Sequence, residues 1–328
     1  MTRRSVAQTH ANIALAKYWG KRDVAANVPA VPSLSVTLEG MRTITSIELA
    51  PDLTADTFEL NGEPAPALAL ERTVTLLDRV RAAAGSADKA RVVSHNDFPT
   101  SSGLASSASG FAALAVAAAH VYALDWSLER VSDLARRSSA SAARSVFGGF
   151  VELGCDLPAS GVLGASVVAP ADHLDVRVLV CVTSEGAKAV ASTDGMRRTA
   201  ERSPYYAAWV ERAPVMFSSL KAALLARDLE QVGELTEASA LAMHASAMAA
   251  AVVYVTGATL QALAQVRELR ARGYAAWATM DAGPHVKVLV SAADAAAVRA
   301  AMVEVPGVLR VLEARPGHGA TVVADDAS

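Results

Sequence analysis

The stretch SHNDFPTSSGLASSASG at residues 94–110, which runs directly into the apolar segment FAALAVAAA, is the most informative part of this chain. Its small residues stand where a long helix is expected to begin, from Gly103 to about Tyr122. The first turn of a helix has unpaired N–H groups and the positive end of the helix dipole, so a Gly/Ser loop that leads into it can hold phosphate oxygens. The alternative is an ordinary Ser-rich start of a buried, Ala-rich helix. No Gly-Lys-Ser/Thr follows, so this is not a Walker loop.

The composition describes a globular chain with a small negative charge. Its 328 residues, 52% hydrophobic and 19% charged, exclude a disordered protein and allow one or two domains. With a net charge of −3 and no Lys/Arg cluster, we expect no nucleic-acid partner. We also expect no membrane span and no signal peptide, since the longest apolar stretch, residues 111–124, is short and Ala-rich. Cys155 and Cys181 lack metal-ligand spacing and fit a reducing cytoplasm.

Apolar runs and turn residues predict a mixture of strands and helices. Strands are expected at residues 43–50, 57–60, 90–94, 146–153, 176–183, 274–280 and 286–291. Helices are expected at residues 68–84, 103–122, 128–137, 259–272 and 292–303, with one more in each of 204–227 and 228–248. This order indicates an α+β fold. The polar string at residues 184–204 interrupts the apolar pattern and predicts a domain boundary.

Two segments carry cations in unusual surroundings. In NIALAKYWGKRD at 12–23, Lys17 and Lys21 share a face if the segment is helical and can then reach one anion. The spacing alone favours the alternative, an amphipathic strand with snorkelling lysines. In RRSSASAARSVFGG at 136–149, the small neighbours of Arg144 leave its guanidinium free to clamp a carboxylate or phosphate. Arg136 and Arg137 have a simpler explanation, because they complement the dipole at a helix end.

A third segment, TMDAGPH at 279–285, places one carboxylate at a strand end before a Gly-Pro turn. A buried Asp281 needs a partner, for which a lysine or a substrate hydroxyl would serve. A turn-forming aspartate without a catalytic role is an equally good interpretation. The seven histidines are scattered singly, so no metal cluster is expected.

Six segments in register resemble the diphosphomevalonate decarboxylase family, within the superfamily of galactokinase, homoserine kinase and mevalonate kinase. They are NIALAKYWGKRD at 12–23, SLSVTL at 33–38, NDFPTSSGLASSASG at 96–110, ARRSSASAARSVFGGFVE at 135–152, STDGM with SP at 192–204, and MDAGP at 280–284. The resemblance implies a two-domain α+β small-molecule-kinase fold. An N-terminal α/β ATP-binding domain, residues 1–185 with the phosphate loop 99–109, would precede a C-terminal ferredoxin-like α/β domain, residues 186–328, that carries the catalytic aspartate. The active site would lie in the cleft between them.

The resemblance also implies a reaction. ATP and Mg²⁺ would be co-substrates with mevalonate 5-diphosphate, and the products would be isopentenyl diphosphate, CO₂, ADP and phosphate, in isoprenoid biosynthesis. Phosphorylation of the tertiary C3 hydroxyl makes a good leaving group, and its loss lets the neighbouring carboxylate leave as CO₂. Members of the family are commonly homodimers, and a cytoplasmic location is expected.

Site residues follow from the same resemblance. Asp281 would accept or orient the hydroxyl proton, Lys17 would keep it ionised, and Arg144 would grip the substrate carboxylate. Substrate-binding residues would be Tyr18, Trp19, Gly20, Lys21, Arg72, Ser139, Ala140, Ser141, Ala142, Ala143, Ser192 and Thr193. ATP-binding residues would be Ser94, Asn96, Ser101, Ser102, Gly103, Leu104, Ala105, Ser106 and Ser107, with Ser107 the hydroxyl nearest Mg²⁺.

Some positions depart from the family pattern. This chain has Val31-Pro32 where the family commonly has Asn-Ser. It has Ser138 and Ala140 where the family has glycines, and His285 where an asparagine is usual. None removes a proposed catalytic group, but all bear on the fit around the diphosphate end. Three alternatives stay open: a decarboxylase of mevalonate 5-phosphate, a kinase that phosphorylates C3 without decarboxylation, and a non-catalytic ligand sensor. The presence of the Asp/Lys/Arg set favours a decarboxylase over the last two.

Overall fold

One long strand organises the sheet of this protein. The computed structural model describes residues 3–50, 52–98, 106–186 and 189–323. Strand β4 (Ser33–Leu49) pairs with β1 (Arg4–Ala16), β7 (Ala90–Asn96), β8 (Phe150–Leu153) and β13 (Arg310–Pro316). Its first six residues are all buried, whereas its second half alternates between buried and more exposed positions. The first part therefore runs through the interior, and the second part forms a sheet with one open face.

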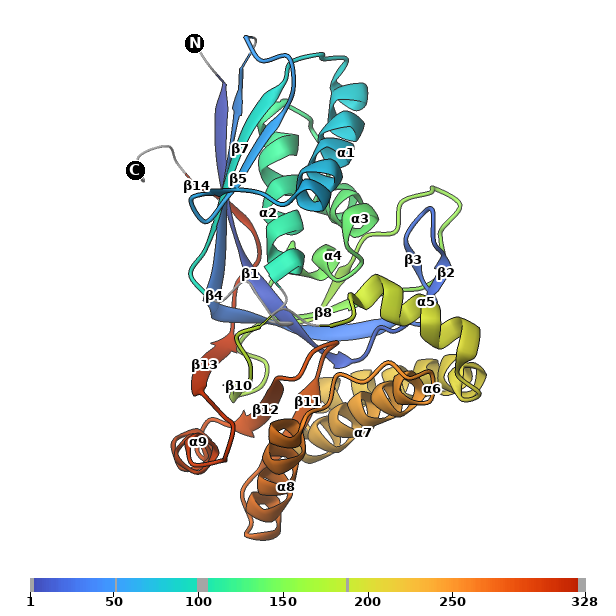
Figure 1. Cartoon of the computed structure of the whole chain (residues 1–328), viewed down its shortest axis with the longest axis vertical. Helices are drawn as coiled ribbons and strands as arrows, with labels where there is room; N and C mark the ends of the chain where they lie inside the picture. Colours follow the sequence, from blue (N-terminus) through green and yellow to red (C-terminus); the bar gives the residue numbers. More distant parts are fainter. Residues whose placement is uncertain (1–2, 51, 99–105, 187–188, 324–328) are drawn as a thin grey trace.

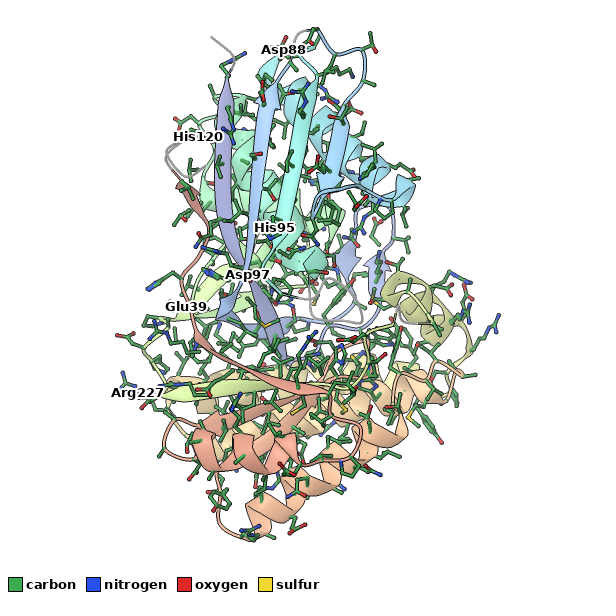
Figure 2. All side chains as sticks on the ribbon, turned by 60° about the vertical axis from the view of Figure 1, so that its left-hand side comes forward. Glu39, Asp88, His95, Asp97, His120 and Arg227 are labelled. Carbon is green, nitrogen blue, oxygen red and sulfur yellow. The ribbon has the colours of Figure 1, made fainter. Side chains whose placement is uncertain are left out.

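The N-terminal half packs helices against one face of this sheet. Its remaining elements are β2 (Lys21–Asp23), β3 (Val28–Pro29), β5 (Thr57–Leu60), β6 (Glu63–Pro64), α1 (Ala67–Ala84), α2 (Ser106–Val121), α3 (Leu128–Ser138), α4 (Ala142–Ser145) and β9 (Ser166–Ala169). Helices α1 to α4 lie together on one side of the strands (Figure 1). Figure 2 looks onto the opposite side, where the exposed His95 of β7 lies. Helix α2 is the centre of this half, because twelve of its residues are buried.

The C-terminal half continues the same sheet. Its elements are β10 (Val176–Val182), α5 (Ser192–Arg202), α6 (Tyr206–Leu225), α7 (Leu229–Met248), α8 (Gly257–Ala271), β11 (Ala276–Met280), β12 (Val286–Ser291), α9 (Ala295–Val303) and β14 (Thr321–Val323). The strand order is β11-β12-β10-β13-β4-β7-β5-β6, and β14 pairs with β1. The last two strands therefore return to the N-terminal half. Within the described ranges no helix is both long and apolar enough to cross a bilayer.

The predicted α+β fold is confirmed, and several elements differ in detail. The polar string at 184–204 contains helix α5, which buries Met196 and Thr199, rather than only a boundary. The strand expected at 146–153 begins at Phe150, because Gly148 and Gly149 lie against the backbone of residues 317–319 and 169–171. The helical alternative for Lys17 and Lys21, which the spacing did not favour, is excluded, since one follows β1 and the other begins β2. The start of the helix predicted from Gly103 lies outside the described residues.

A buried glycine on α7 sets how closely this helix packs on the sheet. A Cβ atom at Gly233 would lie 2.0 Å from Cδ2 of Trp277 on β11. We expect Gly233→Ala to lower the free energy of unfolding by about 1–3 kcal/mol, because overpacking outweighs the helix propensity of alanine. Gly257→Ala is the matched control, since nothing lies within 4 Å of its Cβ position. Chemical denaturation measures both, and a Gly233→Ala protein as stable as the parent would refute the tight contact.

Candidate active site

Asp281 and Lys17 meet in the interior between the two halves of the chain. Asp281 directly follows β11, and Lys17 directly follows β1. The Lys17 Nζ atom donates to Asp281 Oδ1 at 2.8 Å and to the Ala14 carbonyl at 2.8 Å. The side chain of Lys17 is 1% exposed, whereas that of Asp281 is 25% exposed. The carboxylate is therefore held from behind by a buried ammonium and open on its other side.

A second lysine, which the sequence analysis missed, holds the same carboxylate. Lys287 lies in β12 and is fully buried, and its Nζ atom lies 3.4 Å from Asp281 Oδ2. The only signal in the sequence is a lysine inside the otherwise apolar strand VKVLVS. Arg177 stands in the similar strand VRVLVCV, where it is partly exposed and pairs with Asp175 at the surface. A single cation in an apolar strand therefore does not distinguish a site residue from a surface residue.

The two lysines fix the ionisation of the aspartate. Burial acts to raise the pKa of Asp281, but the charges of Lys17 and Lys287 outweigh it and hold this pKa well below its ordinary value. Burial lowers the pKa of Lys17 to about 8, against the opposing pull of the Asp281 charge. Asp281 is therefore an anion at neutral pH, and Lys17 is a cation that loses its proton more readily than an ordinary lysine.

Arg144 lies nearby, held by three side chains from β1 and β4. Its Nε atom donates to Ser35 Oγ at 2.9 Å, its Nη1 to Ser33 Oγ at 2.6 Å, and its Nη2 to Asn12 Oδ1 at 3.4 Å. Ser33 and Ser35 are two positions apart on β4 and therefore point to the same side of the strand. This geometry explains the SLSVTL segment, whose two serines orient the guanidinium.

The electrostatics place Arg144 in the same site as the lysine and the aspartate. Burial lowers the pKa of Arg144 to about 10, while the charge of Asp281 acts in the opposite direction. The charge of Arg144 also lowers the pKa of Lys17. The structure thus brings together the three residues that were predicted to be catalytic. Their roles in a reaction stay predictions.

Predicted substrate-binding residues line the neighbouring space. The hydroxyl of Tyr18 is buried without a hydrogen-bond partner among the described residues, and the charge of Arg144 acts on it. The Ser139 and Ser141 hydroxyls lie 3.1 Å apart, between α3 and α4. Burial and the charge of Arg72 lower the pKa of Lys21. Two cations and several hydroxyls on this side suit a phosphate-bearing ligand.

A cavity of about 170 Å³ opens between α1, α2 and the sheet. Arg72 lines it, with its guanidinium 4.4 Å from the ring centroid of Phe111, and donates to the Ser138 carbonyl. The apolar lining of the cavity includes Phe58, Leu60, Val92, Phe111 and Leu114. Its polar lining includes Ser94, Asn96, Ser106 and Ser107. Arg72, predicted to bind the substrate, therefore lies beside residues predicted to bind ATP. Ser101, Ser102, Gly103, Leu104 and Ala105 lie outside the described residues.

The other predicted residues shape the fold around the site. The indole N–H of Trp19 donates to Thr199 Oγ1 at 3.1 Å, so this donor is used inside the protein. Gly20 has a φ of +103°, and a Cβ there would lie 2.1 Å from the Tyr206 hydroxyl. Ser192 and Thr193 begin α5. The three predicted alanines, Ala140, Ala142 and Ala143, are all buried. Their small size lets the segment with Ser139 and Ser141 pack closely.

Two buried histidines stand beside the charged cluster. His244 of α7 is 3% exposed, and neither ring nitrogen has a hydrogen-bond partner in the part of the chain that the structure describes. His285 accepts a hydrogen bond from the Thr183 backbone N–H at 3.1 Å through Nδ1. Burial lowers the pKa of each to about 4, and nearby lysine charges act in the same direction. Both rings are therefore neutral at neutral pH. The described residues hold no group of three or more His, Cys, Asp or Glu arranged to bind a metal ion.

The low pKa of His244 predicts acid-sensitive stability. Between pH 6.5 and 4 the unfolded chain binds a proton on this side chain that the folded protein does not, so stability falls as the pH drops through this window. At pH 5 this linkage costs about 2 kcal/mol. We expect the loss of unfolding free energy from pH 7 to pH 5, measured by urea denaturation, to be smaller in His244→Gln by about that amount. His95→Gln, at the exposed histidine in Figure 2, should keep the full loss. Equal losses in all three proteins would rule out the linkage.

Comparison with known proteins identifies the family. Residues 9–159 match the family model of the diphosphomevalonate decarboxylase-like N-terminal domain, and residues 178–312 match that of the mevalonate 5-diphosphate decarboxylase C-terminal domain. The diphosphomevalonate decarboxylase of Candida albicans is 35% identical over 302 residues, which span 86% of this chain and 83% of the relative. The crystal structure of mevalonate diphosphate decarboxylase from Staphylococcus aureus superimposes with a TM-score of 0.93 at 34% identity, over 99% of both chains. A structure of MDDEF in complex with MVAPP, AMPPCP and magnesium gives a TM-score of 0.91 at 36% identity, over 98% of this chain and 99% of the other. The chain belongs to the diphosphomevalonate decarboxylase family.

Proposed function

We propose that this protein catalyses the ATP-dependent decarboxylation of mevalonate 5-diphosphate to isopentenyl diphosphate. The observation that carries the proposal is the meeting of Lys17, Asp281 and Arg144 in one site of a chain with this family's fold. The reaction needs an anion beside a tertiary hydroxyl, a cation for the transferring phosphoryl group and a clamp for the carboxylate that leaves as CO₂. Asp281 supplies the anion, Lys17 supplies the cation, and Arg144 supplies the clamp.

Asp281 acts on the C3 hydroxyl. Its carboxylate is ionised at neutral pH and partly exposed, so it can accept a hydrogen bond from the hydroxyl and take up its proton as the phosphoryl group arrives. Lys17 stabilises negative charge on the transferring group from the adjacent position. After transfer, the C3 phosphate leaves, positive charge develops at C3 and the carboxylate departs as CO₂.

Arg144 fixes the substrate carboxylate. A guanidinium has five N–H groups, and three of them are directed to Ser33, Ser35 and Asn12. One N–H on Nη1 and one on Nη2 remain for a ligand within the described part of the site. Two parallel N–H groups match the two oxygens of a carboxylate, so Arg144 can hold it in a single orientation.

The nucleotide and the magnesium ion are co-substrates, and the cavity beside α2 suits them. Its apolar wall fits a base, and its serines and asparagine fit ribose and phosphate oxygens. Ser106 and Ser107 begin the described part of α2 and line this cavity, and Ser107 is the proposed hydroxyl nearest Mg²⁺. The MDDEF structure with AMPPCP and magnesium supports the same pair of ligands for this chain. In-line phosphoryl transfer then depends mainly on positioning and charge stabilisation.

Lys21, Arg72, Tyr18, Ser139 and Ser141 are the proposed contacts of the 5-diphosphate end. The charge of Arg144 acts on Tyr18, and that of Arg72 acts on Lys21. Arg72 also donates to the carbonyl of Ser138, which precedes the hydroxyl pair of Ser139 and Ser141. Ser192 and Thr193, in the first turn of α5, are proposed to complete this side. The wall of the substrate site is proposed to be shaped by Trp19, Gly20, Ala140, Ala142 and Ala143.

We also propose a division into an ATP-binding domain at residues 1–185 and a C-terminal domain at 186–328, a homodimeric assembly and a cytoplasmic location. The two family models support two domains. The first match ends at residue 159 and the second begins at residue 178, so the junction falls between these positions. Strand β10, which precedes residue 185, pairs with β12 and β13 from the second half. The homodimer rests on the common state of the family, and the location on the free cysteines Cys155 and Cys181.

The proposed function predicts a measurable release of CO₂. Purified protein with ATP and Mg²⁺ should release CO₂ from mevalonate 5-diphosphate, and faster than from the monophosphate, because Lys21 and Arg72 supply charge for the second phosphate. Carbon-14 release from 1-labelled substrates, with ADP formation measured in parallel, gives both rates. ADP without CO₂ would indicate a kinase that stops at C3 phosphorylation. Binding without ADP would indicate a ligand sensor, and a faster monophosphate reaction would reverse the substrate assignment.

The role of Asp281 is tested by one substitution. Asp281→Asn should lower kcat by at least about a hundredfold, because the amide cannot take up the hydroxyl proton. ATP affinity, measured by equilibrium titration, should change little, since the nucleotide cavity is lined by α1, α2 and the sheet. Asp88→Asn, at an exposed aspartate paired with Arg3, is the control and should keep full activity. An active Asp281→Asn protein would refute the role.

A further inference from the structure

The carboxylate of Asp281 is held by a different lysine on each oxygen. Lys17 Nζ lies 2.8 Å from Oδ1, and Lys287 Nζ lies 3.4 Å from Oδ2. Lys17 directly follows β1, whereas Lys287 lies within β12. Strand β12 pairs with β11, which ends at the residue before Asp281. The carboxylate thus has a cation at each oxygen, and the two cations come from distant parts of the chain.

A structural role alone does not explain Lys287, because its buried position would suit an apolar side chain. It is fully buried and stands opposite Thr279 of β11 and Val180 of β10. Burying an ammonium costs more free energy than a well-packed apolar group would, even when the ammonium is paired. The buried pair with Asp281 is therefore weak evidence for a stabilising role of Lys287, and its contact with the carboxylate indicates a functional one.

The other groups around Asp281 do not replace Lys287. Arg144 on α4 adds positive charge, but it donates its hydrogen bonds to Ser33, Ser35 and Asn12. His244 on α7 and His285 in the turn before β12 are neutral at neutral pH. Lys17 donates its hydrogen bond to Oδ1. Without Lys287, the Oδ2 oxygen would lose its cation, and the carboxylate could rotate about its bond to Cβ.

We propose that Lys287 is a positioning residue of this enzyme, which acts through Asp281 by holding the Oδ2 oxygen so that the carboxylate keeps one orientation and one charge state toward the substrate hydroxyl. This inference rests on the proposed function, because it concerns the residue assigned to the C3 hydroxyl. Lys287 does not contact the reacting atoms. Its loss therefore affects the chemical step through Asp281, and leaves binding of the diphosphate by Lys21 and Arg72 intact.

The test is a neutral substitution of similar length, Lys287→Met. We expect kcat for mevalonate 5-diphosphate to fall by about tenfold to a hundredfold, since a misplaced catalytic group costs that much. KM should change by less than about threefold, because uniform substrate binding is retained. The acid limb of the kcat profile should move to higher pH, because one of the two cations that hold the pKa of Asp281 down is gone. A kcat fall without movement of the acid limb would show a merely structural role and overturn the proposal, as would an unchanged kcat.

Two further variants separate positioning from general damage. Val288→Ala alters the next residue of β12, which packs in the core on the other side of the sheet, and should lower stability without moving the acid limb. Lys287→Gln is a second neutral variant in case Lys287→Met does not fold, because its amide can still donate to Asp281. It should move the acid limb in the same direction, and an acid limb equal to that of the parent would overturn the proposal.

A measurement on substrate-free protein can test the role of Lys287 separately from the proposed decarboxylase activity. Carbon-13 NMR of aspartate carboxyl carbons, with Asp281 assigned through Asp281→Asn, follows the ionisation of Asp281 in substrate-free protein. In the parent this carboxyl should stay ionised well below the ordinary range, and in Lys287→Gln it should take up its proton at higher pH. Identical titrations would overturn the role of Lys287 even if the parent releases CO₂. If the parent releases none, the proposed function fails, and the NMR result still decides whether Lys287 controls Asp281.

Discussion

The buried ion pair between Lys17 and Asp281 is the contact on which the rest of the site depends. It joins residues 264 positions apart and links the end of β1 to the end of β11. Removal of one partner from a buried pair leaves an uncompensated charge, so each residue requires the other. Arg144 and Lys287 then add positive charge around one carboxylate. The site thus carries more buried cations than anions, which suits a substrate that brings a carboxylate and phosphates of its own.

Much of the fold was predictable because local rules agree with it. The helix at residues 128–137 was predicted from Ser127, whose side chain accepts from the Arg130 backbone N–H in the structure. The long strands were harder. The second part of β1 and the first part of β4 are buried on both faces, so the alternation that marks a half-exposed strand is missing there. Helix α5 was missed because it buries only a narrow stripe within a very polar segment.

The site was predictable from motifs, but its supporting contacts were not. The segments around Lys17, Arg144 and Asp281 identified the three charged residues, and the structure brings them together. No local pattern showed that Ser33 and Ser35 orient Arg144, because this contact crosses 109 to 111 positions of the chain. The role of Lys287 depends on the register of β12 against β11, which the sequence of either strand does not specify. Contacts between distant segments are therefore the part that needed the structure.

The return of the last strands to the first ones has a consequence for synthesis on the ribosome. Strand β1 is made well before β14 and obtains this neighbour only when residues 321–323 have been made. The pairing of β4 with β13 likewise waits for residues 310–316. Until then the nascent chain carries open strand edges, which are templates for unwanted pairing with other chains. Pairing of β13 and β14 then covers these edges, so a chaperone is needed there only until these two strands have been made.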